Sequence, residues 1–197
     1  MVFEVYSGTF TAGTRFTPVT SDEDSVPNPD SLSSPDTLAG QVAQLIRLVR
    51  TGEEANIKLA FLLAEGLGHP PAFQAYLERL LPLYQLAFEH TPAQLEADAL
   101  GKLFQLTRIN ISQRGLTALP ENIGALQNLQ SLDCSENQLP ALPESLAALH
   151  NLRELNCAAN QLQAMPESIG KLYNLQALDC AGNQLQALPE SLESYKT

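Results

Sequence analysis

The sequence lacks the features that would direct it to a membrane or to a nucleic acid. Its 197 residues include 11 Lys and Arg against 22 Asp and Glu, which gives a net charge of -11. Clustered basic side chains are needed to bind nucleic-acid phosphates or an anionic lipid surface, so we expect neither as a ligand. No apolar run of about 18 residues is present, so we predict no membrane-spanning helix.

Cysteines and targeting signals are also scarce. The chain has three cysteines, and an odd number argues against a secreted disulfide framework. Residues 1–6 lack both the basic and the apolar segments of a signal peptide. We therefore predict a reducing, cytoplasmic location.

Sequence motifs of catalysis are missing as well. The chain has no nucleophile elbow, no H-E-x-x-H motif and no C-x-x-C motif. The pairs Gly101-Lys102 and Gly170-Lys171 are each followed by Leu rather than Ser or Thr, which excludes a phosphate-binding loop. The three histidines share no spacing with each other or with the cysteines. We predict no enzymatic activity, no cofactor and no metal site.

Residues 1–34 have the composition of a flexible arm and linker. Scattered apolar residues at the start suggest a hairpin around Gly13. From Thr20 to Ser34 the chain is rich in Ser, Pro and Asp. This stretch has too little apolar surface to offset the entropy lost on ordering.

Helical periodicity predicts a small all-α domain over residues 35–102. Ser34 and Pro35 form a start signal, with Ser as the N-cap and Pro at the first helical position. The apolar face of this first helix runs on until Gly52, and a second helix stops at Gly66.

Two further helices are expected in the same domain. The third starts near Pro70-Pro71, and Pro82 should kink or break it. The pair Thr91-Pro92 opens a last short helix that ends near Gly101. Short connections of this kind predict antiparallel packing in a small bundle.

From Leu103 to residue 197 the chain repeats itself every 23 residues. Four units begin at residues 103, 126, 149 and 172. Leu132 and Cys134 alternate around Asp133, and this period of two predicts a short strand with one buried face. A single unit cannot bury that face alone, so we expect the units to stack into a parallel sheet with one continuous core.

The spacing resembles the leucine-rich repeat family, whose signature is L-x-x-L-x-L-x-x-N-x-L. The signature appears here as Leu129, Leu132, Cys134, Asn137 and Leu139, and it recurs in the next two units. The resemblance implies an α/β fold, a solenoid of short parallel strands preceded by the helical cap. The 23-residue form is similar to intracellular repeats of the Ras-suppressor type and to bacterial Roco-type arrays that precede a GTPase domain.

Within this family the Asn side chains form a hydrogen-bond ladder inside the turn. The resemblance assigns that role to Asn137, Asn160 and Asn183. The first unit departs from the pattern because Arg114 stands where Asn belongs. A buried guanidinium needs partners, so we expect the ladder to start one unit later and the first unit to form the transition to the cap.

Two columns of repeated side chains have both a chemical and a structural interpretation. Cys134, Cys157 and Cys180 stand 23 residues apart. We read them as small buried hydrophobic residues, because a straight column of three thiols cannot supply four tetrahedral ligands to a soft metal. Glutamates recur after Pro at one phase of every unit: Glu121, Glu144, Glu167 and Glu190. We favour a solvated role at the start of a helical turn over a calcium-binding row.

The strand residues that point away from the core should line the concave surface, where leucine-rich repeats usually bind their ligands. They are Arg108, Asn110, Ser112, Ser131, Asp133, Ser135, Glu154, Asn156, Ala158, Ala177, Asp179 and Ala181. The face is small and acidic and lacks aromatic side chains, which often carry binding energy. We therefore predict a protein–protein interaction module whose partner presents a basic segment.

The alternative is a regulatory N-terminal fragment of a larger signalling enzyme such as a Roco-type GTPase. The array stops after Leu192 with no visible cap. Three arrangements fit this end. The last residues fold over the core, two ends meet in a self-associated dimer, or the native chain continues past Thr197, which we favour.

Overall fold

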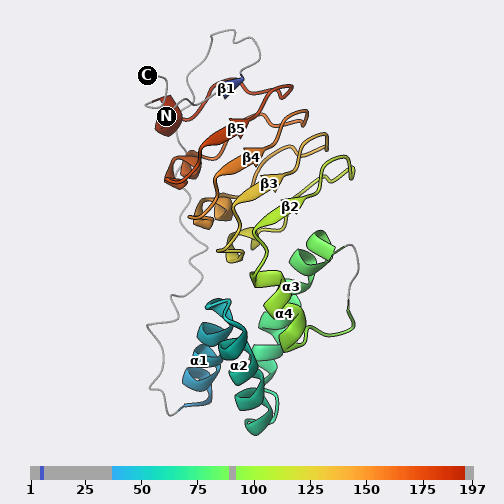
Figure 1. Ribbon diagram of the computed structural model, residues 1–197, viewed down its shortest axis with the longest axis vertical. Helices are drawn as coiled ribbons and strands as arrows, with labels where there is room; N and C mark the ends of the chain where they lie inside the picture. Colours follow the sequence, from blue (N-terminus) through green and yellow to red (C-terminus); the bar gives the residue numbers. More distant parts are fainter. Residues whose placement is uncertain (1–4, 7–36, 89–91, 194–197) are drawn as a thin grey trace.

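The computed structural model describes residues 5–6, 37–88 and 92–193. Within them the chain forms a solenoid of stacked coils with a helical cap at one end (Figure 1). The predicted hairpin around Gly13 and the linker of residues 20–34 lie outside the described residues. No described helix is long and apolar enough to cross a membrane.

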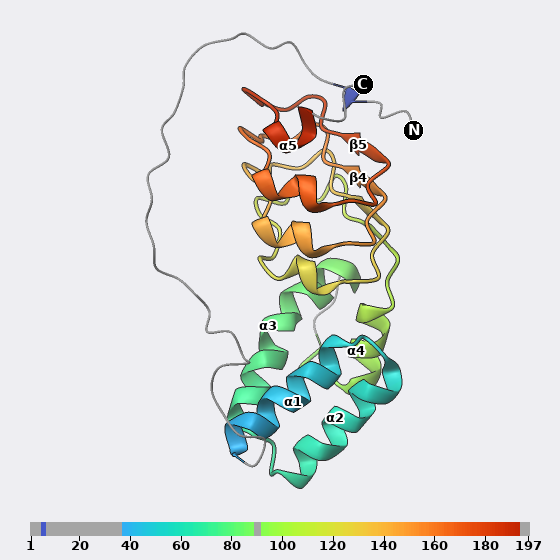
Figure 2. The ribbon, with the colours of Figure 1, turned by 90° about the vertical axis from the view of Figure 1, so that its left-hand side faces the viewer.

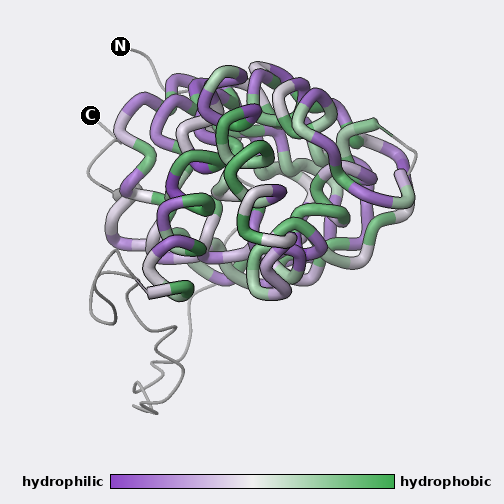
Figure 3. Tube along the Cα trace, turned by 90° about the horizontal axis from the view of Figure 1, so that it is seen from below, coloured by the Kyte–Doolittle hydropathy of each residue, from purple (hydrophilic) through white to green (hydrophobic). Residues whose placement is uncertain are grey.

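The cap consists of four helices, which are α1 (Leu38–Arg50), α2 (Glu54–Gly66), α3 (Pro71–Phe88) and α4 (Ala97–Phe104). The first two pack side by side as an antiparallel hairpin, and α2 also packs against α4 (Figure 2). Their core is apolar and centres on Leu45, Ile57, Phe73 and Leu100, each at most 2% exposed. Seen from the cap end, hydrophobic and hydrophilic stretches alternate along the helices and along each coil (Figure 3).

Three helix boundaries differ from the sequence predictions. Helix α1 begins at Leu38 rather than at Pro35, because the Thr37 side chain accepts the hydrogen bond from Gly40 N at 3.2 Å and takes the N-cap role. Helix α4 begins at Ala97, five residues after Pro92, and runs past the buried Gly101 to Phe104.

A kink or a break was predicted at Pro82, and the break is wrong, because α3 continues through it to Phe88. Leu83 lies directly after the proline and is fully buried, and Leu86 is also buried in the core. Burial of this last stretch offsets the single backbone hydrogen bond that proline removes.

The solenoid contributes four parallel strands and a short helical turn on the return path of each coil. The strands are β2 (Arg108–Asn110), β3 (Ser131–Asp133), β4 (Glu154–Asn156) and β5 (Ala177–Asp179). The return turns are η2 (Ile123–Ala125), η3 (Glu144–Ala148), η4 (Glu167–Lys171) and α5 (Glu190–Glu193). Strands pair in register with a shift of one repeat, as with Leu132 opposite Leu155. The strands lie on one side of the solenoid and the return turns on the other (Figure 2).

A fifth strand, β1 (Val5–Tyr6), completes the sheet in the order β1-β5-β4-β3-β2. It pairs in parallel with β5, Val5 opposite Leu178 and Tyr6 opposite Asp179. Two residues from the start of the chain therefore occupy the outer edge of the last strand. This pairing could not be predicted from the sequence, because Val5 and Tyr6 lie outside the 23-residue repeats and far from β5 along the chain.

A ladder of buried asparagines holds the turns after the strands. The Asn160 amide nitrogen donates to the carbonyl oxygens of Cys134, Cys157 and Ala158 at 3.0–3.2 Å, and its oxygen accepts from Leu139 N. Asn137 and Asn183 make the equivalent bonds one repeat earlier and later. Each amide thereby satisfies backbone groups that the bend leaves without partners in the strand ladder.

A second asparagine ladder lies on the opposite side of the core. Asn128, Asn151 and Asn174 each donate to a backbone carbonyl of the preceding coil, at 2.9, 2.8 and 2.7 Å. The sequence carries a signal for this ladder that was not used in the predictions, the Asn-Leu pair before β3, β4 and β5. The first member, Asn128, donates to Phe104 O at the end of α4, so this ladder also fixes the solenoid to the cap.

Arg114 makes a second connection between the two regions. Its guanidinium donates to Leu86 O in the last turn of α3 at 2.9 Å and to Asn110 O at 3.2 Å. A cation at the C-terminal end of a helix also interacts favourably with the helix dipole. The residue that breaks the repeat pattern is therefore the one that binds the first coil to α3.

Candidate functional site

The concave face is the exposed side of the strands. The middle residue of each strand, Ile109, Leu132, Leu155 or Leu178, is buried at no more than 6% exposure, and its two neighbours point the other way. Because the strands pair in register, these neighbours line up in rows across the sheet. One row is Arg108, Ser131, Glu154 and Ala177, and the next is Asn110, Asp133, Asn156 and Asp179.

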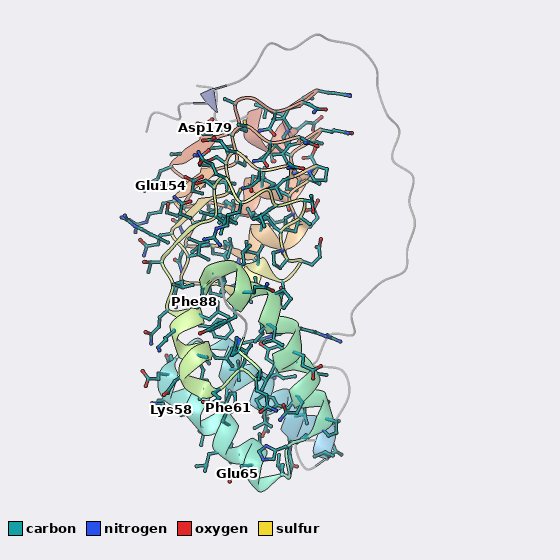
Figure 4. All side chains as sticks on the ribbon, turned by 90° about the vertical axis from the view of Figure 1, so that its right-hand side faces the viewer. Lys58, Phe61, Glu65, Phe88, Glu154 and Asp179 are labelled. Carbon is teal, nitrogen blue, oxygen red and sulfur yellow. The ribbon has the colours of Figure 1, made fainter. Side chains whose placement is uncertain are left out.

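An open hollow of ≈ 350 Å³ lies across three strands of this face, β3 to β5. Its charged lining residues are Asp133, Glu154 and Asp179, and no Lys or Arg lines it. Figure 4 shows the side chains of Glu154 and Asp179 on the strand side of the solenoid, far from the cap. The hollow is therefore a negatively charged surface with room for an extended side chain or a short peptide segment.

The acidic residues of the central row also stabilise the strand ends. One carboxylate oxygen of Asp133 accepts hydrogen bonds from Ser135 N at 3.0 Å and Ser135 Oγ at 2.7 Å. Asp179 accepts from Ala181 N in the same way. Asn156 uses its amide oxygen for the equivalent bond to Ala158 N, so an amide serves this local role as well as a carboxylate does.

The same local bond is therefore made by Asn and by Asp in the central row. The row needs a side-chain oxygen at every strand end, and a negative charge is not required for that bond. Asp133 and Asp179 were placed in the site from the sequence, but their bonds to the turn were not predicted.

The remaining predicted site residues differ in how much surface they offer. Glu154 and Ala177 are exposed, whereas Ser135 is only 7% exposed and contributes little. Ser112, Ala158 and Ala181 are half-buried. Arg108 is exposed at the end of the row that adjoins the cap. The face is therefore positive over β2 and negative over β3 to β5.

The three cysteines lie behind this face in the core. All are free thiols, at most 3% exposed. Burial, together with the nearby Asp133 carboxylate, raises the pKa of the Cys134 thiol to about 12, and burial raises the pKa values of Cys157 and Cys180 as well. Cys134 and Cys157 donate through sulfur to the carbonyls of Asn156 and Asp179, each at 3.3 Å. At neutral pH the thiols are protonated and serve as packing residues.

The repeated glutamates lie at the return turns, opposite the concave face. Glu121, Glu144 and Glu167 are exposed, as is Glu190 at the start of α5. Among residues 5–6, 37–88 and 92–193, no three His, Cys, Asp or Glu side chains gather so that they could hold a metal ion.

The sequence of residues 71–162 matches the family described as "Leucine-rich repeat region". The matched stretch covers α3, α4 and the strands β2 to β4, with the first two members of each asparagine ladder. The chain therefore contains a leucine-rich repeat region. Its fold is the predicted α/β solenoid with a helical cap, and that prediction is confirmed.

Solved leucine-rich repeat structures resemble this chain over part of its length. A leucine-rich repeat protein of Leptospira interrogans is 40% identical over 50% of this chain and 25% of that protein, with a TM-score of 0.47. The BIR3–SERK2 complex from Arabidopsis thaliana includes a chain that is 30% identical over 39% of this chain and 43% of that one, with a TM-score of 0.37.

The leucine-rich repeat domain of the type III effector XopL is 22% identical over 84% of this chain and 62% of that one, with a TM-score of 0.44. The chain thus spans between a quarter and about three fifths of the lengths of these three chains. No curated protein sequence matches it.

Proposed function

We propose that this chain is an interaction module that binds a basic segment of a partner protein on its concave face. It acts by contact alone, without catalysis, and it works in the cytoplasm. The observation that carries the proposal is the hollow over β3 to β5, which three carboxylates and no cation line. The leucine-rich repeat region supports a protein partner.

Electrostatics favour a basic ligand over a neutral or acidic one. Asp133, Glu154 and Asp179 come from three neighbouring strands that lie about 4.8 Å apart, so their potentials add over a small area. A Lys or Arg side chain laid across the strands approaches more than one carboxylate. Bidentate contact with a carboxylate favours Arg over Lys.

Arg108 sets the direction in which such a segment lies. It stands on β2, one strand beyond the acidic hollow, and repels a cation from the cap end of the face. A segment with a basic part followed by an acidic or polar part therefore fits with its basic part over β4 and β5. This polarity gives the face specificity that total charge alone would not give.

The buried thiols support both a binding role and a reducing compartment. Cys134 keeps its proton far above neutral pH, so it is not available as a nucleophile. Three free cysteines at most 3% exposed are compatible with a reducing environment.

The test is the binding of labelled peptides, followed by fluorescence anisotropy. We expect a Lys- and Arg-rich peptide to bind, and an acidic peptide of the same length not to bind. Affinity for the basic peptide should fall as salt is added, because the contact is partly exposed and screened. The peptide is a probe of the face, and the natural partner is then sought by capture from a lysate with the same proteins.

The variant uses isosteric changes that leave the fold intact. In the triple variant Asp133→Asn, Glu154→Gln, Asp179→Asn, the new amides keep the strand-end hydrogen bonds, as Asn156 already does. The matched control removes three charges from the return turns, Glu121→Gln, Glu144→Gln and Glu167→Gln. Loss of binding in the first variant alone supports the proposal. Equal loss, or no loss, in both variants contradicts it.

A further inference from the structure

Helix α2 carries a row of apolar side chains on its solvent side. Its buried residues are Ile57, Ala60 and Ala64, which face α1 and α4. Leu59 and Leu62 lie on the opposite side of the helix and are 43% and 66% exposed. Large apolar side chains in a row on a surface helix usually mark a contact with another protein.

The spacing of the exposed row is that of a helix–helix seam. Ala55, Leu59, Leu62 and Gly66 are separated by four, three and four residues, and all four are exposed. This alternation is the a and d pattern of a coiled coil. The small Ala and Gly at the two ends allow close approach of a second helix, and the two leucines in the middle supply the apolar contact.

The row is flanked by one basic and one acidic side chain, Lys58 and Glu65, which can form ion pairs between two copies of α2. Lys58 and Glu65 lie seven residues apart on one flank of the row, and Figure 4 shows both at the cap, well away from Glu154 and Asp179. When two copies of α2 pair antiparallel with Leu59 opposite Leu62, Lys58 of each copy stands opposite Glu65 of the other. Leu63, 46% exposed, then packs at the other flank.

The existing contacts of the two charged residues allow this pairing. The Lys58 ammonium lies 2.6 Å from Glu54 and 3.4 Å from Asp98, and about half of the side chain remains exposed. An ammonium has three donors and accepts a further carboxylate. Among the described residues, no cation lies within ion-pair distance of Glu65.

We propose that the partner of the exposed α2 face is a second copy of this chain, in a symmetric dimer built on antiparallel α2 helices. The proposal is independent of the concave face, which stays open in such a dimer. In a two-fold symmetric dimer the same α2 surface is used by both copies. Each residue of that surface therefore contributes twice to the binding free energy. A helix of 13 residues offers a small interface, so the dimer is expected to be weak, with a dissociation constant on the order of micromolar.

The first experiment measures the mass of the full chain by analytical ultracentrifugation over a range of concentrations. We expect a reversible monomer–dimer equilibrium. Leu62→Glu should raise the dissociation constant by roughly tenfold or more, because it places two charges in the apolar seam. The control Tyr173→Glu changes an equally exposed apolar side chain on the last repeat, 76% exposed, and should leave the equilibrium unchanged.

The second experiment tests the antiparallel register. Glu65→Lys alone places Lys opposite Lys and should weaken the dimer by about three- to tenfold. Lys58→Glu alone places Glu opposite Glu, with a similar effect. A mixture of the two variants restores both ion pairs, so a mixed dimer should form with close to the original affinity. Circular dichroism confirms that each variant is folded, since Lys58→Glu also loses the contact with Asp98.

Three outcomes overturn the proposal. A chain that remains monomeric up to near-millimolar concentration has no such dimer. A dimer that survives Leu62→Glu associates elsewhere, for instance through the C-terminal end of the solenoid. A dimer that loses affinity with Leu62→Glu but shows no recovery in the mixture does not pair in this register.

Discussion

The cap and the solenoid both bury apolar side chains, but they do so by different means. The cap packs large apolar side chains from four helices around one centre, as with Phe73 against Phe61 at 5.8 Å between ring centroids. The solenoid has no such centre, because each coil contacts only its neighbours and repeats the same leucines, thiols and amides every 23 residues. A core substitution in the cap should therefore destabilise the whole cap. A substitution in one coil should mainly destabilise that coil and its neighbours.

The largest expected loss of stability comes from a cavity made in the core of the cap. Phe73→Ala removes a ring that is 1% exposed, so the free energy of unfolding should fall by about 3–5 kcal/mol. Urea unfolding followed by circular dichroism measures the change. Glu78→Ala, on the exposed side of the same helix, is the control and should change the free energy by less than about 0.5 kcal/mol.

The corresponding substitution in the solenoid removes a buried polar side chain, Asn160. Asn160→Ala leaves the buried Leu139 N–H without its partner and removes one of the two donors from each of three carbonyl oxygens. It should cost about 1–3 kcal/mol. Asn151→Ala removes one bond from an exposed residue and should cost about 1 kcal/mol or less. If the two substitutions had equal effects, the buried ladder would not be the main polar support of the solenoid.

Alkaline pH should weaken the solenoid through its thiols. Burial raises the pKa of the Cys134 thiol to about 12 in the folded state, whereas the ordinary pKa of an unfolded thiol is 9.0. The unfolded state therefore loses protons first, and stability is full below about pH 9 and falls as pH rises toward 12. Comparison with a triple Cys→Ala variant isolates this contribution. A difference between the two proteins that does not change with pH would contradict it.

A smaller loss of stability than that of Phe73→Ala is expected at the junction between the two regions. Arg114→Met keeps the apolar stem and the backbone bond to Asn137 but loses the donors to Leu86 O and Asn110 O. We expect a loss of about 1–2 kcal/mol. Arg153→Met, at an exposed position before β4, serves as the control. Separate unfolding transitions of cap and solenoid in Arg114→Met would show that this side chain couples them.

The repeats could be predicted from the sequence because periodicity is a redundant signal. The alternation of buried and outward side chains around Asp133 recurs in each 23-residue unit. One unit is therefore enough to predict the strands, their register and the rows of outward side chains. The helix boundaries carry no such redundancy. Ser34-Pro35 and Thr91-Pro92 are single local signals. A competing local cap, Thr37, sets the start of α1, and α4 extends to residues buried in the core, Leu103 and Phe104.

The candidate site could be predicted in outline only. Outward orientation follows from the period of two, but the bonds of Asp133 and Asp179 to their turns depend on backbone geometry after the strand. The partners of Arg114 could not be named either, because Leu86 is 28 residues away and belongs to a helix expected to kink or break at Pro82. Contacts between the cap and the solenoid join residues far apart in the sequence, so no local sequence pattern predicts them.

The second asparagine ladder has a consequence for how such a chain changes in evolution. Asn151 donates to Gln127 O in the coil before its own, and Asn174 donates to His150 O in the coil before its own, so these coils offer their neighbours the same donors and acceptors. A duplicated 23-residue unit inserted between residues 148 and 149 meets a compatible surface on both sides without any further substitution. The array can therefore lengthen in steps of one strand spacing, about 4.8 Å. New binding surface arises by copying, and only afterwards by point mutation.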